Sequence, residues 1–163
     1  HLKTQQSDST VINIAGRQRM LSQKLTKEIV SLSALSSVNA RKELKSNIEK
    51  TLSLWELSHY SLQKGNDSLG LPKENSKKVN QKFKLINPVF DTIKNASQII
   101  VNKLAKNITV SEVDLDSCIK KVTRNEGSFL LKMDQIVNQY DMEANEKVSW
   151  LKKLENMFIV LQV

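Results

Sequence analysis

The sequence contains few of the residues that build disulfide-rich, metal-binding or sheet proteins. Its 163 residues include one cysteine and two histidines, which excludes an intrachain disulfide and leaves too few clustered ligands for a zinc or haem site. Four glycines, two prolines and 5% aromatic residues are fewer than the turns and strand faces of a sheet require. These absences favour an all-α protein with no metal and no cofactor.

Long apolar runs are also missing. A transmembrane helix needs about 20 predominantly apolar residues, and the sequence has no such stretch. The chain starts with His1 rather than with methionine or a signal peptide, so we expect residues 1–163 to be a single domain excised from a longer protein. The apolar segment Met157–Leu161 fits either the last turns of a core or the approach to a membrane helix, and we expect the former.

The net charge is +8, from 25 basic and 17 acidic residues, but its pattern does not favour nucleic-acid binding. The lysines are spread along the chain and interleaved with acidic and amide residues, without the runs of like charge or the aromatic platforms of such proteins. We therefore expect no nucleic-acid partner. The few arginines are Arg17, Arg19, Arg41 and Arg124. Two of them lie in one short segment, where a planar anion would require them.

Apolar periodicity predicts an antiparallel four-helix bundle with long first and last helices. The first three helices are expected at about 5–38, 40–64 and 74–107, with a loop at 65–72 and a kink at Pro88. Thr109–Glu112 has the spacing of a capping box and should start the last helical region. Gly127 is expected to divide that region into a short extra helix and a long final helix. Both termini would then lie at the same end.

The first helix carries two stripes. One reads as the core seam and consists of Ile14, Gln18, Leu21, Leu25, Ile29 and Leu32. The other lies roughly opposite and consists of Ile12, Gly16, Arg19 and Gln23. A glycine inside a helix costs about 1 kcal/mol relative to alanine, and close approach of another backbone to this second stripe would explain Gly16.

The segment Ile12-Asn-Ile-Ala-Gly-Arg-Gln-Arg-Met-Leu-Ser-Gln-Lys24 resembles the N-terminal motif of bacterial receptors of the NarX nitrate/nitrite-sensor and PilJ chemoreceptor type. About a dozen consecutive positions match. Lys24 stands where the family usually has arginine, which keeps the charge but loses the planar guanidinium.

The resemblance implies an extracytoplasmic, periplasmic sensor domain of a transmembrane chemoreceptor or histidine kinase, anchored in the inner membrane by flanking helices and not itself an enzyme. It further implies a homodimer in which Arg19 of both copies binds one small planar anion, nitrate or possibly nitrite. Gly16, Ala15, Ile12 and Met20 would complete the ligand site. The dimer interface would consist of Ile12, Gly16, Arg19 and Gln23.

A second hypothesis treats the domain as a dimerisation and signal-coupling module that binds no ligand, or an unrelated small molecule. Arg17 and Arg19 would then pair with acidic residues such as Glu28, Glu143 or Glu146. Catalysis has little support, because His59 and Cys118 lack any spacing that predicts a nucleophile with an orienting partner. We expect Cys118 to be a core thiol and Arg17 to pair with a carboxylate on the flank of the bundle.

Overall fold

The computed structural model describes residues 2–35, 37–105 and 112–161. These residues form four α-helices and two short 3₁₀ turns, in the order α1 (Leu2–Ser31), η1 (Leu32–Ala34), α2 (Val38–Lys64), η2 (Asp67–Leu69), α3 (Lys77–Ala105) and α4 (Glu112–Leu161). The all-α bundle predicted from the sequence is confirmed. The proposed capping residues before Glu112 lie outside the described residues.

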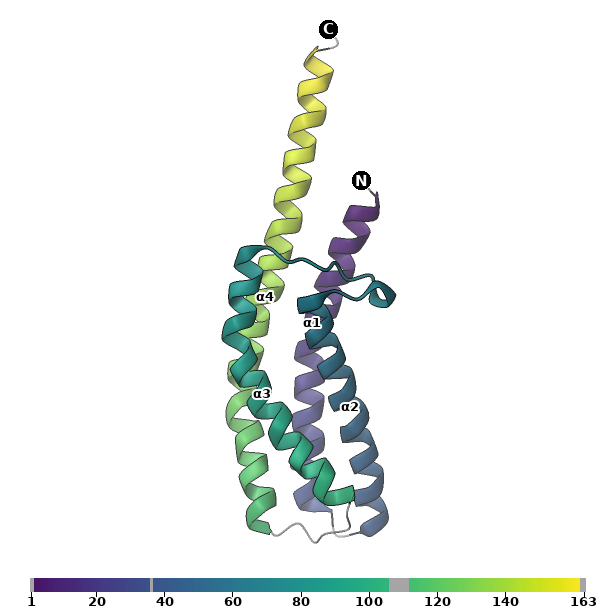
Figure 1. The fold of residues 1–163 in the computed structure, drawn as a ribbon, viewed down its shortest axis with the longest axis vertical. Helices are drawn as coiled ribbons and strands as arrows, with labels where there is room; N and C mark the ends of the chain where they lie inside the picture. The colour runs from purple at the N-terminus through teal and green to yellow at the C-terminus, as the bar shows by residue number, and fades with distance from the viewer. Residues whose placement is uncertain (1, 36, 106–111, 162–163) are drawn as a thin grey trace.

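The four helices run alternately up and down, so that the start of α1 and the end of α4 lie at the same end of the molecule (Figure 1). Helix α1 packs against α2 and α4, and α3 also packs against α2 and α4. Each helix therefore has two neighbours around a common core, as in other antiparallel bundles. The predicted placement of both termini at one end is confirmed.

The core forms where the apolar stripes of the four helices meet. All six members of the predicted α1 seam are buried, including the polar Gln18, whose Nε2 donates a hydrogen bond to the backbone carbonyl of Trp55 at 3.3 Å. The largest fully buried side chains are Trp55 from α2, Phe83 and Phe90 from α3, and Phe129 from α4. The ring of Trp55 lies 4.4 Å from that of Phe90 and 4.9 Å from that of Phe129, between centroids. Aromatic contacts thus join three helices at mid-bundle.

Two helix boundaries differ from the sequence prediction. Helix α1 ends at Ser31 and passes into η1, while Val38 already belongs to α2. Helix α4 is continuous for 50 residues, so Gly127 does not end a short helix. Gly127 is exposed, and buried apolar residues on both sides, Val122 and Phe129, keep α4 against the bundle. Their packing outweighs the roughly 1 kcal/mol that glycine costs in a helix.

Pro88 lies inside α3 without ending it. Because proline removes one backbone donor and clashes with the preceding turn, a bend is expected there. Helix α3 changes direction about halfway along its length (Figure 1), in agreement with the predicted kink.

The end of α4 projects beyond the other helices (Figure 1). Met157 and Phe158 are 50% and 59% exposed, and Leu151 and Leu154 are half-buried. The expectation that Met157–Leu161 completes the core is therefore wrong, because no other described helix reaches this level. None of the described helices is long and apolar enough to span a membrane.

Candidate functional site

Arg19 lies on the flank of α1 that faces α4. Its guanidinium Nη1 donates to a carboxylate oxygen of Asp134 on α4, and the two side chains are 43% and 46% exposed. A half-exposed ion pair of this kind contributes only about 0–1 kcal/mol, because solvent screens the charges. Arg19 therefore has a partner within its own chain, but one that another anion can replace at small cost.

An open depression on the outer surface surrounds this ion pair. Its lining comes from both helices: Gly16, Arg19, Met20, Gln23, Leu130, Leu131 and Asp134. Met20 and Leu131 are 55% and 61% exposed, so the charged pair is flanked by accessible apolar side chains. Four residues that the sequence placed at the ligand site or dimer interface thus lie together, on the outside of the bundle.

Two other predicted residues lie elsewhere. Ala15 is 0% exposed and belongs to the hydrophobic core, because it falls on the inward side of α1 between Val11 and Gln18. The prediction that Ala15 lines the ligand site is therefore corrected. Ile12 is half-buried one turn before Gly16 and does not line the depression. The stripe assigned to the interface is accordingly a flank of α1 beside α4 and is not opposite the core.

Sequence reasoning missed the contribution of α4. Asp134, Leu130 and Leu131 line the depression, yet none of them was predicted as a site residue. Asp134 does follow Gly127 by seven residues, or about two helical turns, so both lie on the same side of α4. Only the packing of α4 beside α1 brings this side next to Arg19.

Arg17 occupies the other flank of α1 and is half-buried. Its Nε atom is buried and has no hydrogen-bond partner among the described residues. Of the carboxylates considered from the sequence, Glu28 lies 3.7 Å from Nζ of Lys24, and Glu143 accepts a hydrogen bond from Ser76. The expected carboxylate partner of Arg17 is not found in the described part of the chain, and Arg19 pairs with Asp134 instead.

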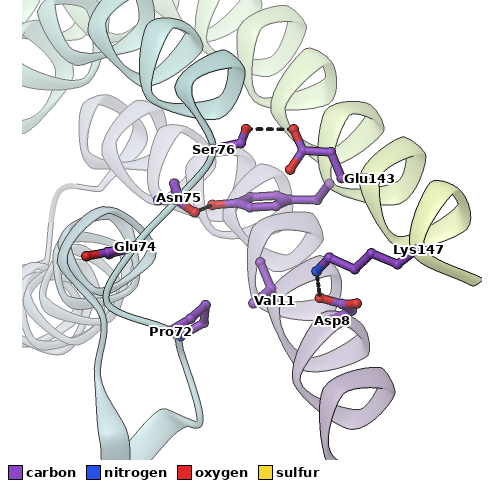
Figure 2. Close-up of a pocket in the computed structure, with 9 residues that line it drawn as sticks. Asp8, Val11, Pro72, Glu74, Asn75, Ser76, Glu143 and Lys147 are labelled. Carbon is purple, nitrogen blue, oxygen red and sulfur yellow. Dashed lines mark hydrogen bonds and ion pairs between the residues drawn. The ribbon is translucent and has the colours of Figure 1, made fainter. Parts of the chain in front are cut away.

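A second pocket, of about 220 Å³, lies between α1, the α2–α3 connection and α4 (Figure 2). Asp8 and Lys147 form an ion pair at 2.8 Å across it, and Ser76 donates to Glu143 at 2.6 Å. The side chain of Asn75 accepts a hydrogen bond from Tyr140 Oη at 2.8 Å and donates one to the carbonyl of Leu62 at 2.7 Å. Contacts across this pocket tie α4 to the α2–α3 connection.

A partly buried set of polar side chains, which we call the His59 cluster, joins α2 to α3. It consists of His59, Gln63 and Asn87 with the ring of Phe90. The His59 ring stacks on Phe90 at 3.7 Å between centroids, and its Nε2 lies 2.8 Å from Oδ1 of Asn87. Asn87 and Gln63 exchange hydrogen bonds of 3.0 and 3.2 Å. Burial lowers the pKa of His59 from 6.5 to about 4, so the ring is neutral at physiological pH.

The described residues do not bring the potentially reactive side chains together. Cys118 is buried in the core, as expected from its apolar neighbours. No cluster of three or more His, Cys, Asp or Glu side chains suited to a metal ion occurs among the described residues. The outer depression around Arg19 is therefore the strongest candidate for a functional site, and Arg19 supplies the positive charge among its lining residues.

A family model described as "Type IV pili methyl-accepting chemotaxis transducer N-term", PilJ, matches residues 1–114. This range contains α1, α2 and α3, and with them the segment around Arg19. Comparison with curated proteins and with solved structures gives no match.

Proposed function

Since the chain belongs to the PilJ family of type IV pili methyl-accepting chemotaxis transducer N-terminal domains, we propose that it senses a small planar anion, nitrate or nitrite, between two copies of the domain. The family match supports a sensory domain of a chemoreceptor-like membrane protein. The anion, the dimer and a periplasmic location are our proposal. Arg19 of each copy would bind the anion, as the NarX-type resemblance of α1 implies.

The half-exposed guanidinium of Arg19 at the centre of the outer depression carries this proposal. A guanidinium presents planar, forked donors that fit a planar oxyanion better than an ammonium does. In a twofold dimer, one arginine per chain supplies two guanidiniums to a single ligand. A small anion between them would relieve the repulsion of two like charges.

The glycines on this face support close approach of a second copy. A Cβ atom added at Gly16 would meet no atom within 4 Å, and the same holds at Gly127. The packing of a single chain therefore gives no reason for glycine at these helix positions, although glycine costs about 1 kcal/mol there. A second backbone packed against the outer face would supply the reason. Met20 and Leu131 would give that interface its apolar surface.

The ends of the bundle suit a receptor inserted between two membrane-spanning segments. Helix α1 starts and α4 ends at the same end of the molecule (Figure 1). A change in the position of α1 relative to α4 would therefore be delivered to one side of the domain. We propose that this end faces the membrane and that the domain lies in the periplasm.

Calorimetric titration of the purified domain with nitrate, nitrite and chloride tests the proposal. We expect one nitrate per two chains in the wild type, strongly weakened binding in Arg19→Lys and no binding in Arg19→Ala. Arg124→Ala is the matched control, because it removes the same charge from an exposed site on α4 and should bind nitrate normally. One anion per single chain, or full affinity in Arg19→Ala, would contradict the proposed site.

The Arg19–Asp134 pair favours a second candidate, a dimerisation and coupling module without a small ligand, because Arg19 is already neutralised. Gly16→Leu, measured by analytical ultracentrifugation, addresses the interface that both candidates share. The added side chain should prevent close approach and weaken the dimer while the helix content stays near that of the wild type. A dimer that is disrupted by Gly16→Leu but binds none of the three anions would select the second candidate.

A further inference from the structure

Asp134 competes with any anion that Arg19 could bind. Its carboxylate accepts a hydrogen bond from Nη1 of Arg19, and a carboxylate and a planar oxyanion compete for the same guanidinium donors and the same positive charge. Asp134 lies beyond the matched residues 1–114, so its role is inferred from geometry. Resting on the function proposed above, we infer that Asp134 is an internal counter-ion that a bound anion must displace, and that the Arg19–Asp134 pair is a latch between α1 and α4.

The charges at a twofold site show why the competition matters. With both pairs intact, two arginines and two aspartates carry no net charge, so an incoming anion gains little attraction. Once Arg19 turns away from Asp134, each guanidinium presents an uncompensated positive charge to the anion. The anion is therefore bound only in the state in which α1 has given up this contact with α4.

The pair joins α1 to α4, so its release changes the contact between these two helices. Among the described residues, the ion pairs that join α1 to α4 are Arg19–Asp134 and Asp8–Lys147. Helix α4 is additionally tied to the α2–α3 connection by the hydrogen bonds of Tyr140 and Glu143. Loss of the Arg19–Asp134 contact consequently removes one of these two ion pairs between α1 and α4, while the helices keep their packing contacts. Binding energy for the anion is thereby coupled to the α1–α4 contact.

The test compares nitrate binding to the wild type, Asp134→Asn and Asp141→Asn by calorimetry. Asp141 is an exposed α4 carboxylate one heptad further along the same side of the helix, and its substitution changes the net charge equally. If each of the two Arg19–Asp134 pairs is formed about two-thirds of the time, both guanidiniums are free in about one-ninth of the dimers, and removing the pairs raises the apparent nitrate affinity about tenfold. We expect this increase in Asp134→Asn and in Asp134→Ser, but not in Asp141→Asn.

A second measurement detects the released charge directly. Without nitrate, Asp134→Asn leaves two unneutralised guanidiniums at the interface, so its dimer should be weaker than that of the wild type and should be restored by nitrate. A purely structural role for Asp134 predicts a lower melting temperature with no gain in affinity. Analytical ultracentrifugation with and without nitrate separates these cases.

The outcomes distinguish the latch from the proposed function. Equal nitrate affinity in the wild type and Asp134→Asn, or weaker binding in Asp134→Asn, overturns the latch and leaves the anion sensor intact. Tighter nitrate binding in Asp134→Asn and Asp134→Ser than in the wild type and Asp141→Asn supports the latch. No nitrate binding by any of these variants overturns both.

Discussion

The His59 cluster and the Arg19–Asp134 pair both join neighbouring helices through polar side chains, but their environments are opposite. His59 is fully buried, stacks on Phe90 and forms one neutral hydrogen bond with Asn87. Arg19 and Asp134 are nearly half-exposed and are joined by charge. A buried neutral network is costly to break because its groups would be left without partners. An exposed ion pair is cheap to exchange, since water and other ions can take its place.

This difference assigns separate tasks to the two regions. The aromatic and neutral contacts among α2, α3 and α4 provide a stable frame. The contacts between α1 and α4 on the outer surface are weak enough for a ligand to change. A sensor needs both, because a ligand can only shift an equilibrium whose states differ by a few kcal/mol.

The largest effect is expected from Phe129→Ala, which removes a fully buried ring beside Trp55. Loss of this ring should lower the free energy of unfolding by about 3–5 kcal/mol, through lost burial and the cavity that remains. Urea denaturation measures the change. Leu85→Ala, at a 65% exposed position of α3 outside the proposed interface, is the control and should change stability by less than about 0.5 kcal/mol. Similar losses of stability in both variants would show that the buried frame and the exposed surface do not differ in their contribution to stability.

The second effect is pH dependence from His59. Burial lowers the pKa of His59 from 6.5 to about 4, so the unfolded chain binds the proton more tightly than the folded protein does. The stability that the neutral, buried ring of His59 contributes is therefore fully present above the pKa of His59 in the unfolded chain. It is lost as the pH falls from about 6.5 towards 4. We expect acidification from about pH 7 to pH 5 to cost about 2 kcal/mol of stability.

Denaturation curves of the wild type and His59→Gln between those pH values check this expectation. Glutamine keeps a donor for Asn87 but does not titrate in this range. The variant should be less stable at neutral pH and should lose less stability on acidification. Parallel pH profiles of the two proteins would show that His59 does not control acid sensitivity.

Tyr140→Phe is expected to have a moderate effect. Burial and nearby Glu143 raise the pKa of the Tyr140 phenol, which therefore stays protonated and donates to Oδ1 of Asn75. Removing the hydroxyl should cost about 1 kcal/mol by loss of this hydrogen bond. Chemical denaturation measures the change. Because the ring remains, a loss as large as that of Phe129→Ala would mean that the hydroxyl organises the whole α2–α3 connection.

The smallest effect is expected from Lys147→Gln, which removes the exposed ion pair to Asp8. The cost should be below about 1 kcal/mol, and it should shrink further as salt screens the charges. Thermal melts at low and high salt provide the measurement. A large loss of stability that persists in high salt would show that the Asp8–Lys147 pair is a structural contact of the frame and not one of the weak, exchangeable contacts.

The sequence predicted the frame well because helix packing follows from a local repeat. The apolar stripe of α1, from Ile14 to Leu32, was correctly assigned to the core, since residues three and four apart must share a face of a helix. The large buried rings of α2 and α3 followed from the same rule. Gly127 misled the prediction because a local preference for a break was overcome by tertiary packing on both sides of it.

Only the α1 part of the candidate site was predicted from the sequence. The residues of α1, from Gly16 to Gln23, could be identified because they form one continuous motif. Ala15 belongs to that motif, yet it faces the core, so membership in a motif does not fix the direction of a side chain. Asp134, Leu130 and Leu131 carried no comparable signal.

The amino-acid sequence by itself determined the helical class, the core seam of the first helix and the motif that contains Arg17 and Arg19, because all three depend on residues close together in the chain. The tertiary structure decided that α4 is unbroken, that Arg19 contacts Asp134 and that its flank forms an open depression with Leu131. These features depend on how far α4 is shifted along α1. That register is set by the summed packing of four helices and is not encoded in any one of them.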